Sequence, residues 1–345
     1  SWAPGDIKMP NNAVTAAARF SAAPMMDWTD RHCRFLHRQL SRQALLYTEM
    51  VTAPALIRGG AVHLLDHSPA EYPLALQLGG SNPSELARAA KLGANAGYQE
   101  VNLNCGCPSD RVKSGTFGAI LMRDAALVAD CVAAMRDAVD VDVTLKCRIG
   151  VDEQNPDEVL PKFLAKIIAA GCERVTIHAR KAWLQGLSPK ENRDIPPLDY
   201  RLVLRMKEYF PNLHISINGG ITSLEQVEAF LAAGLDGVMV GRAAYHQPAD
   251  IFCSADRRIF GASDETSVED AIMAMLPYIE NHLSSGGRLH QITRHMLGLF
   301  AGRAGARLWR RTISEGSAKN GADGELVYSA LSQVMAITNE TNAVI

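Results

Sequence analysis

Short apolar stretches recur along the chain, and each has the length and β-branched content of a buried strand. Eight of them precede residue 243, at residues 19–26, 44–51, 72–80, 100–106, 141–148, 173–180, 213–220 and 237–242. Between most of them apolar residues recur at helical spacing, as in residues 83–97, 123–139, 156–171 and 223–234, and several of these segments end on glycine. Strands and helices are therefore predicted to alternate.

Eight consecutive strand–helix units favour a closed parallel barrel, because such barrels use about 250 residues as one domain. An open dinucleotide-binding sheet would carry a glycine fingerprint after its first strand, and none follows residue 26. The predicted fold is α/β: a (β/α)8 TIM barrel over residues 18–260, followed by a small C-terminal α-helical domain.

The pattern changes after Gly261. Residues 267–286, 290–302 and 324–338 have the spacing of amphipathic helices, with no strand between them. They predict the helical domain over residues 261–345, with residues 261–270 as a polar linker whose end, SVED, is typical of a helix start. Residues 1–17 are predicted to be a flexible leader.

Composition narrows the function classes. The 345 residues carry 35 Lys and Arg against 37 Asp and Glu, a net charge of −2, which excludes a basic protein such as a histone. An apolar fraction of 47% predicts a large core and excludes intrinsic disorder. Seven cysteines without paired spacing indicate a reducing compartment, and we expect a cytoplasmic protein. No apolar stretch reaches membrane-spanning length, no signal peptide is evident, and no stable protein partner is indicated.

The residues that follow the predicted strands are the candidates for chemistry, because barrel active sites lie at the carboxyl ends of the strands. They include Pro24, Met25, Met26, Gln77, Asn102, Asn104, Cys107, Lys146, Arg148, His178, Arg180, Asn218, Gly219, Gly220, Gly241 and Arg242. The loops after strands 7 and 8 are the usual phosphate site of such barrels, and their glycines allow backbone N–H groups to approach a phosphate. A phosphorylated cofactor or substrate is therefore predicted; the alternative is that Gly219 and Gly220 only turn the chain.

Lys146 and His178 each follow an apolar strand, where a buried cation is costly without a partner. An anionic ligand would supply that partner, and a lysine beside a flavin ring could stabilise negative charge on its reduced form. A solvated position at the barrel rim is the alternative for either residue alone.

Cys107 directly follows strand 4, between glycine and proline in a tight turn that would present its sulfur at the barrel mouth. Thiols ordinarily have a pKa of about 8.5, so near neutral pH they are mostly protonated and can act as general acids. Whether Cys105 also reacts stays open, although position favours Cys107. No metal site is expected, because no second Cys or His pair follows at ligand spacing.

Several long motifs resemble tRNA-dihydrouridine synthases across nearly the whole chain. They are APMMDWTDRHCR (23–34), LLYTEMV (45–51), ALQLGG (75–80), NLNCGCPSDRV (102–112), GAILM (118–122), LKCRIG (145–150), INGGI (217–221) and VMVGRAAY (238–245). The segment HARKAWLQGLSPKENRDIPPLDY (178–200) and the C-terminal ITRHMLGLFAGRAGARLWRR (292–311) resemble the A subfamily in particular.

The resemblance implies an FMN-dependent enzyme in which NADPH reduces the flavin and the flavin reduces uridine in the tRNA D-loop, at positions 20 and 20a. Hydride would go from the flavin to uracil C6, and Cys107 would protonate C5. The positions that match FMN contacts are Pro24, Met25, Met26, Gln77, Lys146, His178, Asn218, Gly219, Gly220, Gly241 and Arg242. Asn104 matches a position beside the target base, and Lys190 and Arg193 match tRNA-contacting positions.

A basic segment independently favours an RNA partner. Residues 288–311 hold six arginines and no acidic residue. Arg307, Arg310 and Arg311 are spaced to share one helix face, as contacts along an RNA backbone would require. A solvated basic face with ion pairs elsewhere is the alternative.

Two other functions stay open. A flavin barrel that reduces a free pyrimidine would leave the arginine-rich segment and the second domain unexplained. An RNA-binding protein with a vestigial barrel would not need Cys107, Lys146, His178 or the phosphate-loop glycines.

Overall fold

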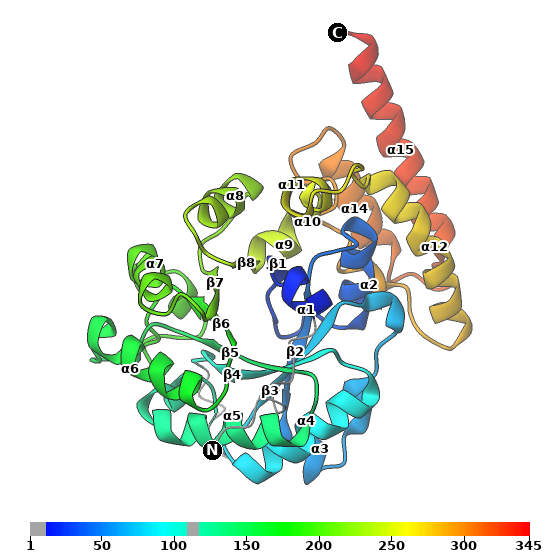
Figure 1. Ribbon diagram of the computed structural model, residues 1–345. Coiled ribbons are helices and arrows are strands. Elements are labelled where there is room, and N and C mark those ends of the chain that lie inside the picture. Colours follow the sequence, from blue (N-terminus) through cyan, green and yellow to red (C-terminus); the bar gives the residue numbers. More distant parts are fainter. Residues whose placement is uncertain (1–11, 109–116) are drawn as a thin grey trace. The chain divides into compact units, whose positions relative to one another are not determined.

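Eight parallel strands form the core of the first of two compact units in the computed structural model, which describes residues 12–108 and 117–345 (Figure 1). The strands are β1 (Phe20–Ala22), β2 (Leu46–Thr52), β3 (Leu74–Gly79), β4 (Glu100–Cys105), β5 (Asp142–Cys147), β6 (Arg174–His178), β7 (His214–Asn218) and β8 (Gly237–Val240). Each predicted strand is present, somewhat shorter than predicted. Successive strands pair side by side from β2 to β8, and β8 pairs with β1.

A single bridge closes the ring between β1 and β2. Leu45, one residue before β2, donates its N–H to Phe20 O at 3.0 Å and accepts the N–H of Ala22 at 3.0 Å. Every strand therefore has a neighbour on both sides, and the predicted TIM barrel is confirmed.

The helices of the first unit lie around the strands, except for α1 (Asn12–Ala17), which is drawn inside their ring (Figure 1). The others are α3 (Ala53–Ile57), α4 (Pro83–Ala96), α5 (Ala125–Ala138), α6 (Pro156–Ala169), α7 (Tyr200–Tyr209) and α8 (Leu224–Ala232), with short 3-10 turns η1 (Val62–Leu65), η2 (Pro69–Glu71), η4 (Gly118–Arg123) and η5 (Glu191–Arg193). The four helices predicted between strands are α4, α5, α6 and α8. Asn82, Asp124 and Asn155 cap three of them by accepting first-turn N–H groups at 2.9–3.1 Å.

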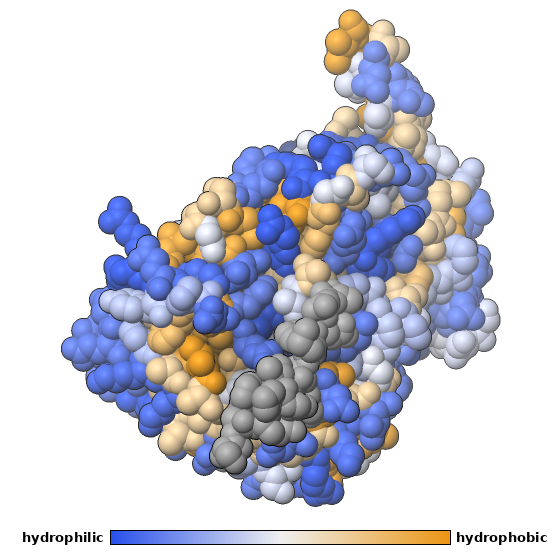
Figure 2. Space-filling view, viewed as in Figure 1, coloured by the Kyte–Doolittle hydropathy of each residue, from blue (hydrophilic) through white to orange (hydrophobic). Residues whose placement is uncertain are grey.

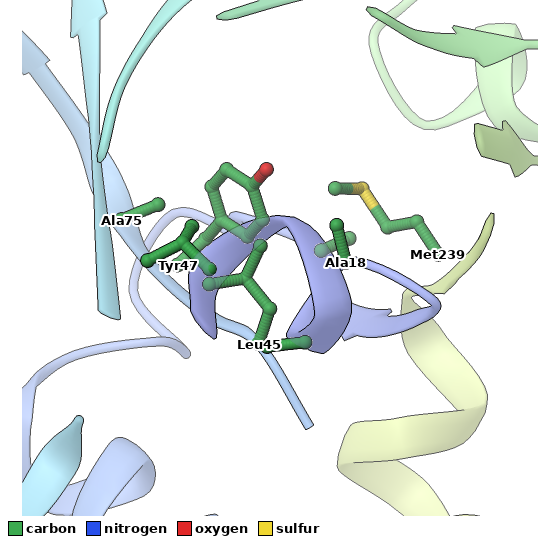
Figure 3. Close-up of a cluster of buried hydrophobic side chains, with 8 residues drawn as sticks. Ala18, Leu45, Tyr47, Ala75 and Met239 are labelled. Carbon is green, nitrogen blue, oxygen red and sulfur yellow. The ribbon is translucent and has the colours of Figure 1, made fainter. Parts of the chain in front are cut away.

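Helix α1 corrects part of the predicted leader. Residues 12–17 are helical, and Val14 and Ala17 are buried in an apolar cluster, so the chain is anchored there. Figure 3 shows Leu45 and Tyr47 of this cluster beside α1, between Ala75 of β3 and Met239 of β8. Burial of these side chains stabilises a helix too short to form alone. Residues 1–11 lie outside the described residues.

The second unit comprises residues 27–44, 222–224 and 242–345. Its helices are α2 (Arg31–Leu40), α9 (Arg242–His246), α10 (Pro248–Phe252), α11 (Ala255–Phe260), α12 (Val268–Ser284), α13 (His290–Thr293), α14 (Ala306–Gly316) and α15 (Gly324–Ala343). It therefore includes segments that lie within the range 18–260 predicted for the barrel. One reason is Asp256 of α11, which accepts hydrogen bonds from Ser41 Oγ at 2.7 Å and from the backbone N–H of Arg42 at 2.8 Å.

The C-terminal helices follow the predicted pattern at both ends but not in the middle. Ser267 caps α12 by accepting the N–H of Asp270 at 3.0 Å, as SVED predicts, and α15 ends near Val344 and Ile345, the exposed apolar tip in Figure 2. The single helix predicted over residues 290–302 is wrong, because only His290–Thr293 is α-helical and turns follow. Gly302 has φ +79°, and a Cβ on Gly298 would lie 2.3 Å from His246 O.

Candidate active site

A buried carboxylate anchors the polar interior of the barrel near its amino-terminal end. Glu100 is fully buried and pairs with Arg174, whose Nη2 lies 2.5 Å from Glu100 Oε1. Its other oxygen accepts the hydroxyls of Tyr47 at 2.6 Å and Thr144 at 2.7 Å. The cost of burying this ion pair is offset because both oxygens of the carboxylate have donors, one from Arg174 and the other from the two hydroxyls.

A ladder of side-chain amides continues from this carboxylate toward the carboxyl ends of the strands. Asn102 Nδ2 donates to Thr144 Oγ1 at 2.9 Å, and Gln77 Nε2 donates to Asn102 Oδ1 at 3.0 Å. Asn104 Nδ2 then donates to Gln77 Oε1 at 3.0 Å. These side chains share the inner face of adjacent strands, because Gln77 pairs with Asn102 in the β3–β4 register and Asn102 pairs with Thr144 in the β4–β5 register.

The Cys107 turn is held from both sides of its backbone. Asn104 Oδ1 accepts the N–H groups of Gly106 at 3.1 Å and Cys107 at 2.9 Å, and the Cys107 carbonyl accepts the N–H of Ala119 at 2.8 Å. Cys107 is partly exposed. The rest of the motif that follows it, residues 109–112, lies outside the described residues.

Cys105 differs from Cys107 in its surroundings. It is fully buried in β4, opposite Cys147 of β5. Burial raises the pKa of the Cys105 thiol well above its ordinary value, and the neighbouring Cys147 thiol adds to the effect. A buried, protonated thiol is unreactive. Cys107 is therefore the accessible thiol of the two, and its role in the reaction stays a prediction.

Lys146 lies at the same end of the barrel and is partly buried. It pairs in register with Asn104, and within the described residues it makes no hydrogen bond or ion pair. Burial lowers its pKa to about 8, the charge of Arg148 adds to the effect, and the thiols of Cys147 and Cys107 oppose it. A cation in this position favours an anionic ligand.

Glycines flank the loops after β7 and β8. Gly219 and Gly220 have φ of +111° and +68°, and a Cβ on them would lie 3.1 Å from His178 Cε1 and 2.6 Å from Leu198 Cδ1, respectively. A Cβ on Gly241 would have Met25 Sδ 3.8 Å away. Positive φ and close neighbours therefore require glycine at 219 and 220, whereas a Cβ at 241 would make only ordinary contacts. Glycines at these strand ends are compatible with the approach of a phosphate to backbone N–H groups.

The remaining predicted contacts of the first unit also lie at strand ends. His178 is mostly buried and accepts the N–H of Arg180 on Nδ1 at 3.3 Å, which leaves Nε2 to carry the proton. Asn218 donates Nδ2 to Met239 O at 3.0 Å. Pro24 is partly buried, whereas Met26 is 49% exposed. A lysine without an acidic partner in the described part of the chain, and glycines at the strand ends, thus fit an anionic, phosphorylated cofactor such as FMN.

The loop of residues 181–196 presents Lys190 and Arg193, both exposed, on either side of the fully buried Asn192. The side chain of Asn192 joins two parts of this loop. Its Oδ1 accepts the N–H of Trp183 at 2.7 Å, and its Nδ2 donates to the Trp183 carbonyl at 2.8 Å. Arg148, which the sequence named without a role, donates to Asn192 O at 2.9 Å.

Arg180 supports the same loop through the carbonyls of Asp194, at 3.2 Å, and Pro196. Burial lowers the pKa of Arg148 to about 10, the Cys107 thiol opposes this, and the charges of Arg180 and Arg193 add to it. A positive group of side chains therefore lies at this end of the barrel.

The second unit holds Arg242, Arg307 and Arg310. Arg242 begins α9, and Arg307, Arg310 and Arg311 are exposed on one face of α14. Two of the six arginines in residues 288–311 are neutralised instead: Arg294 pairs with Asp30 at 2.8 Å and Arg303 with Glu269 at 2.6 Å. Acidic partners far away in sequence thus reduce the basic surface that the segment suggested.

An aromatic and histidine group in the second unit was missed by sequence reasoning. The rings of Trp28 and Tyr245 stack at 4.4 Å, Tyr245 Oη lies 2.9 Å from His295 Nδ1, and His295 Nε2 lies 2.9 Å from Asp30 Oδ1. Burial alone would raise the pKa of Asp30, but the hydrogen bond and charge of His295 outweigh it and lower the pKa to about 2. Asp30 could be recognised only as a helix cap, because its partner is 265 residues away.

The described residues contain neither a metal centre nor a membrane-spanning helix. No group of three or more His, Cys, Asp and Glu side chains there could hold a metal ion, and no helix there is long and apolar enough to cross a membrane. A cavity of about 400 Å³ lies at the amino-terminal end of the barrel, lined by Thr15, Thr144, Arg174 and His214 among others, and it contains none of the predicted site residues.

The closed barrel, the cationic and glycine-lined strand ends and the accessible thiol define an α/β-barrel enzyme. The chain belongs to the dihydrouridine synthase (Dus) family, whose model matches residues 21–336.

Its relatives include three proteins named tRNA-dihydrouridine(20/20a) synthase. The protein of Shewanella oneidensis is 56% identical over 325 residues, covering 94% of this chain and 96% of its own. That of Escherichia coli K12 is 57% identical over 320 residues, covering 92% of each chain. That of Vibrio cholerae is 54% identical over 325 residues, covering 93% of this chain and 98% of its own.

Proposed function

We propose that this protein reduces uridine to 5,6-dihydrouridine in the D-loop of tRNA, at positions 20 and 20a, with FMN as cofactor and NADPH as reductant. The observation that carries the proposal is the accessible Cys107 thiol beside the unpaired Lys146, in a chain 54–57% identical to synthases named for these positions. None of the seven cysteines, all of which lie in the described residues, is in a disulfide, and this supports a reducing, cytoplasmic location.

Different residues at the strand ends would contact the phosphate and the ring system of FMN. Gly219, Gly220, Gly241 and Arg242 would hold the phosphate, and Lys146, His178, Gln77 and Asn218 would contact the ring system, with Pro24, Met25 and Met26 beside it. When bound, reduced FMN supplies the hydride that adds to C6 of the uracil ring. Lys146 contributes positive charge where the cofactor is anionic.

Cys107 donates the proton that C5 requires, since its thiol is partly exposed at this end of the barrel whereas that of Cys105 is buried. Asn104 lies beside the base and holds the Cys107 turn through its Oδ1. The target base must leave its stacking partners to reach these residues. Lys190 and Arg193 of the barrel, with Arg307 and Arg310 of the second unit, would contact tRNA phosphates. The assignment of residues 18–260 to FMN binding and catalysis and of residues 261–345 to tRNA binding is part of the proposal.

The test is mass-spectrometric mapping of dihydrouridine in unmodified tRNA incubated with the protein and NADPH. We expect uridines 20 and 20a to gain two hydrogen atoms each. Cys107→Ala should retain FMN but form about 10²–10⁴-fold less product, the usual contribution of a general acid. A protein that binds no FMN, or modifies free uridine as readily as tRNA, would refute the function; near-normal product from Cys107→Ala would remove only the acid role.

A further inference from the structure

The orientation of Asn104 is dictated from the far end of the barrel, by the Glu100 carboxylate. A carboxylate accepts hydrogen bonds and donates none. Thr144 therefore has to point its hydroxyl hydrogen at Glu100 Oε2, 2.7 Å away. Because that hydrogen is used, the hydroxyl oxygen can only accept from the other neighbour of Thr144, which is Asn102.

The donor and acceptor roles of each following amide are fixed in the same way. Asn102 has to present Nδ2 to Thr144 at 2.9 Å, so its Oδ1 faces Gln77 and requires Nε2 there, at 3.0 Å. Gln77 Oε1 then requires Nδ2 of Asn104, also at 3.0 Å. All of these side chains are at least nine-tenths buried, and among them only Thr144 lines the cavity at the amino-terminal end. Water therefore has little access to the amides and cannot readily substitute for a wrong orientation.

The last amide of the series acts on the catalytic turn. With Nδ2 committed to Gln77, Asn104 has to aim Oδ1 at the N–H groups of Gly106 and Cys107, 3.1 and 2.9 Å away. If the amide rotated by half a turn, its NH2 group would face these two N–H donors and neither bond would form. The turn that carries the Cys107 thiol would then lose its support.

We propose that Thr144 and Asn102 are positioning residues for the reaction, because they transmit the polarity of the Glu100 carboxylate to Asn104 and so fix the Cys107 turn. The proposal rests on the proposed function for the role of Cys107. Neither residue is needed to touch tRNA or cofactor in this role. Their effect should therefore be on catalytic rate and on presentation of the thiol, not on tRNA affinity.

Thr144→Val tests this most directly, since it removes one hydroxyl and keeps the shape of the side chain. Two measurements are made on the full-length, FMN-loaded protein: steady-state dihydrouridine formation, and the rate of Cys107 alkylation by iodoacetamide, followed by peptide mass spectrometry. We expect kcat to fall about 10- to 100-fold, as for other misplaced catalytic groups, with KM for tRNA within about twofold of wild type and an altered alkylation rate.

Thr144→Ser keeps the hydroxyl and should restore both values. Thr176→Val is the matched control, because Thr176 is buried in the barrel strand β6 but takes no part in the amide series. Should Thr144→Val fail to fold, Asn102→Leu breaks the same series one link nearer Asn104 and should give the same split between kcat and KM.

The proposal is overturned if Thr144→Val alkylates and turns over like wild type, if serine does not rescue it, or if Thr176→Val is equally impaired. The alkylation comparison does not depend on turnover. A wild-type protein that forms no dihydrouridine would thus refute the proposed function, while the alkylation rates would still decide whether Thr144 positions Cys107.

Discussion

At the scale of a single residue, we expect Lys146 to make cofactor binding depend on pH. Burial lowers its pKa to about 8, so the side chain is cationic at pH 7 and mostly neutral at pH 9. If Lys146 stabilises anionic FMN, affinity should be full below about pH 8 and fall as the pH rises through that value. The phosphate of FMN, with a second pKa near 6, is fully ionised over this range.

We expect the Kd of FMN, measured by quenching of flavin fluorescence in titrations of apoprotein, to rise about 10-fold between pH 7 and pH 9.5. Lys146→Met should bind FMN about 10-fold more weakly at pH 7, the equivalent of about 1.4 kcal/mol, and lose most of the pH dependence. A methionine variant that keeps the full wild-type pH profile would show that another group titrates.

Residue positions in the site were predictable wherever a strand end determines them. Lys146, Cys107 and His178 could be placed at the barrel mouth because the apolar strand before each of them is evident in the sequence. Asn102 was named only as a strand-end residue without a role, and Thr144 was not named, since the role of a polar residue on the inner face of a strand is evident only once its cross-strand partner is known. The same holds for Arg148, whose partner is a loop carbonyl 44 residues away.

At the scale of the elements, the 3-10 turn η4 supports the Cys107 turn, whose carbonyl accepts the N–H of Ala119 at 2.8 Å. Gly118 begins η4 at φ +82°, and a Cβ there would lie 2.4 Å from Cys107 O. Gly118→Ala should therefore displace the Cys107 peptide and lower dihydrouridine formation at least about 10-fold, while FMN content is retained.

Gly60→Ala is the matched control for this substitution. Gly60 also has a positive φ, +62°, but a Cβ on it would meet nothing within 4 Å. The free energy of unfolding of Gly60→Ala should fall by about 1–2 kcal/mol, because alanine is strained at a positive φ. Urea denaturation measures this loss, and turnover should stay normal. If both variants turn over equally well, η4 does not hold Cys107.

The elements also differ in how far local sequence determines them. The strands and the helices α4, α5, α6 and α8 follow from periodicity and caps. Helix α1 depends on burial of Val14 and Ala17 against strands that come later in the chain, so its sequence alone suggested a leader. The helix predicted over residues 290–302 had the right spacing, but Gly298 packs against His246 O and the chain turns there instead.

For the molecule as a whole, charge distribution matters more than net charge. The total of −2 conceals a segment, residues 288–311, with six arginines and no acid. Folding then removes part of this surplus, because Arg294 and Arg303 pair with Asp30 and Glu269. Sequence could identify the segment but not these partners. The charge left for RNA on α14 is that of Arg307, Arg310 and Arg311.

This division predicts how tRNA binding responds to salt. Each arginine that contacts a phosphate releases counterions, so the slope of log K against log salt concentration should shrink by about 0.7–0.9 for each contact removed. Arg307→Ala and Arg310→Ala should each weaken binding and reduce the slope by that amount, measured by fluorescence anisotropy with labelled tRNA. Arg303→Ala is the control: its guanidinium lies 2.6 Å from Glu269, so its removal should leave the slope nearly unchanged. If Arg307→Ala and Arg310→Ala keep the slope of the wild-type protein, as Arg303→Ala should, α14 does not bind the RNA backbone. The tRNA contacts would then belong to the barrel loop alone.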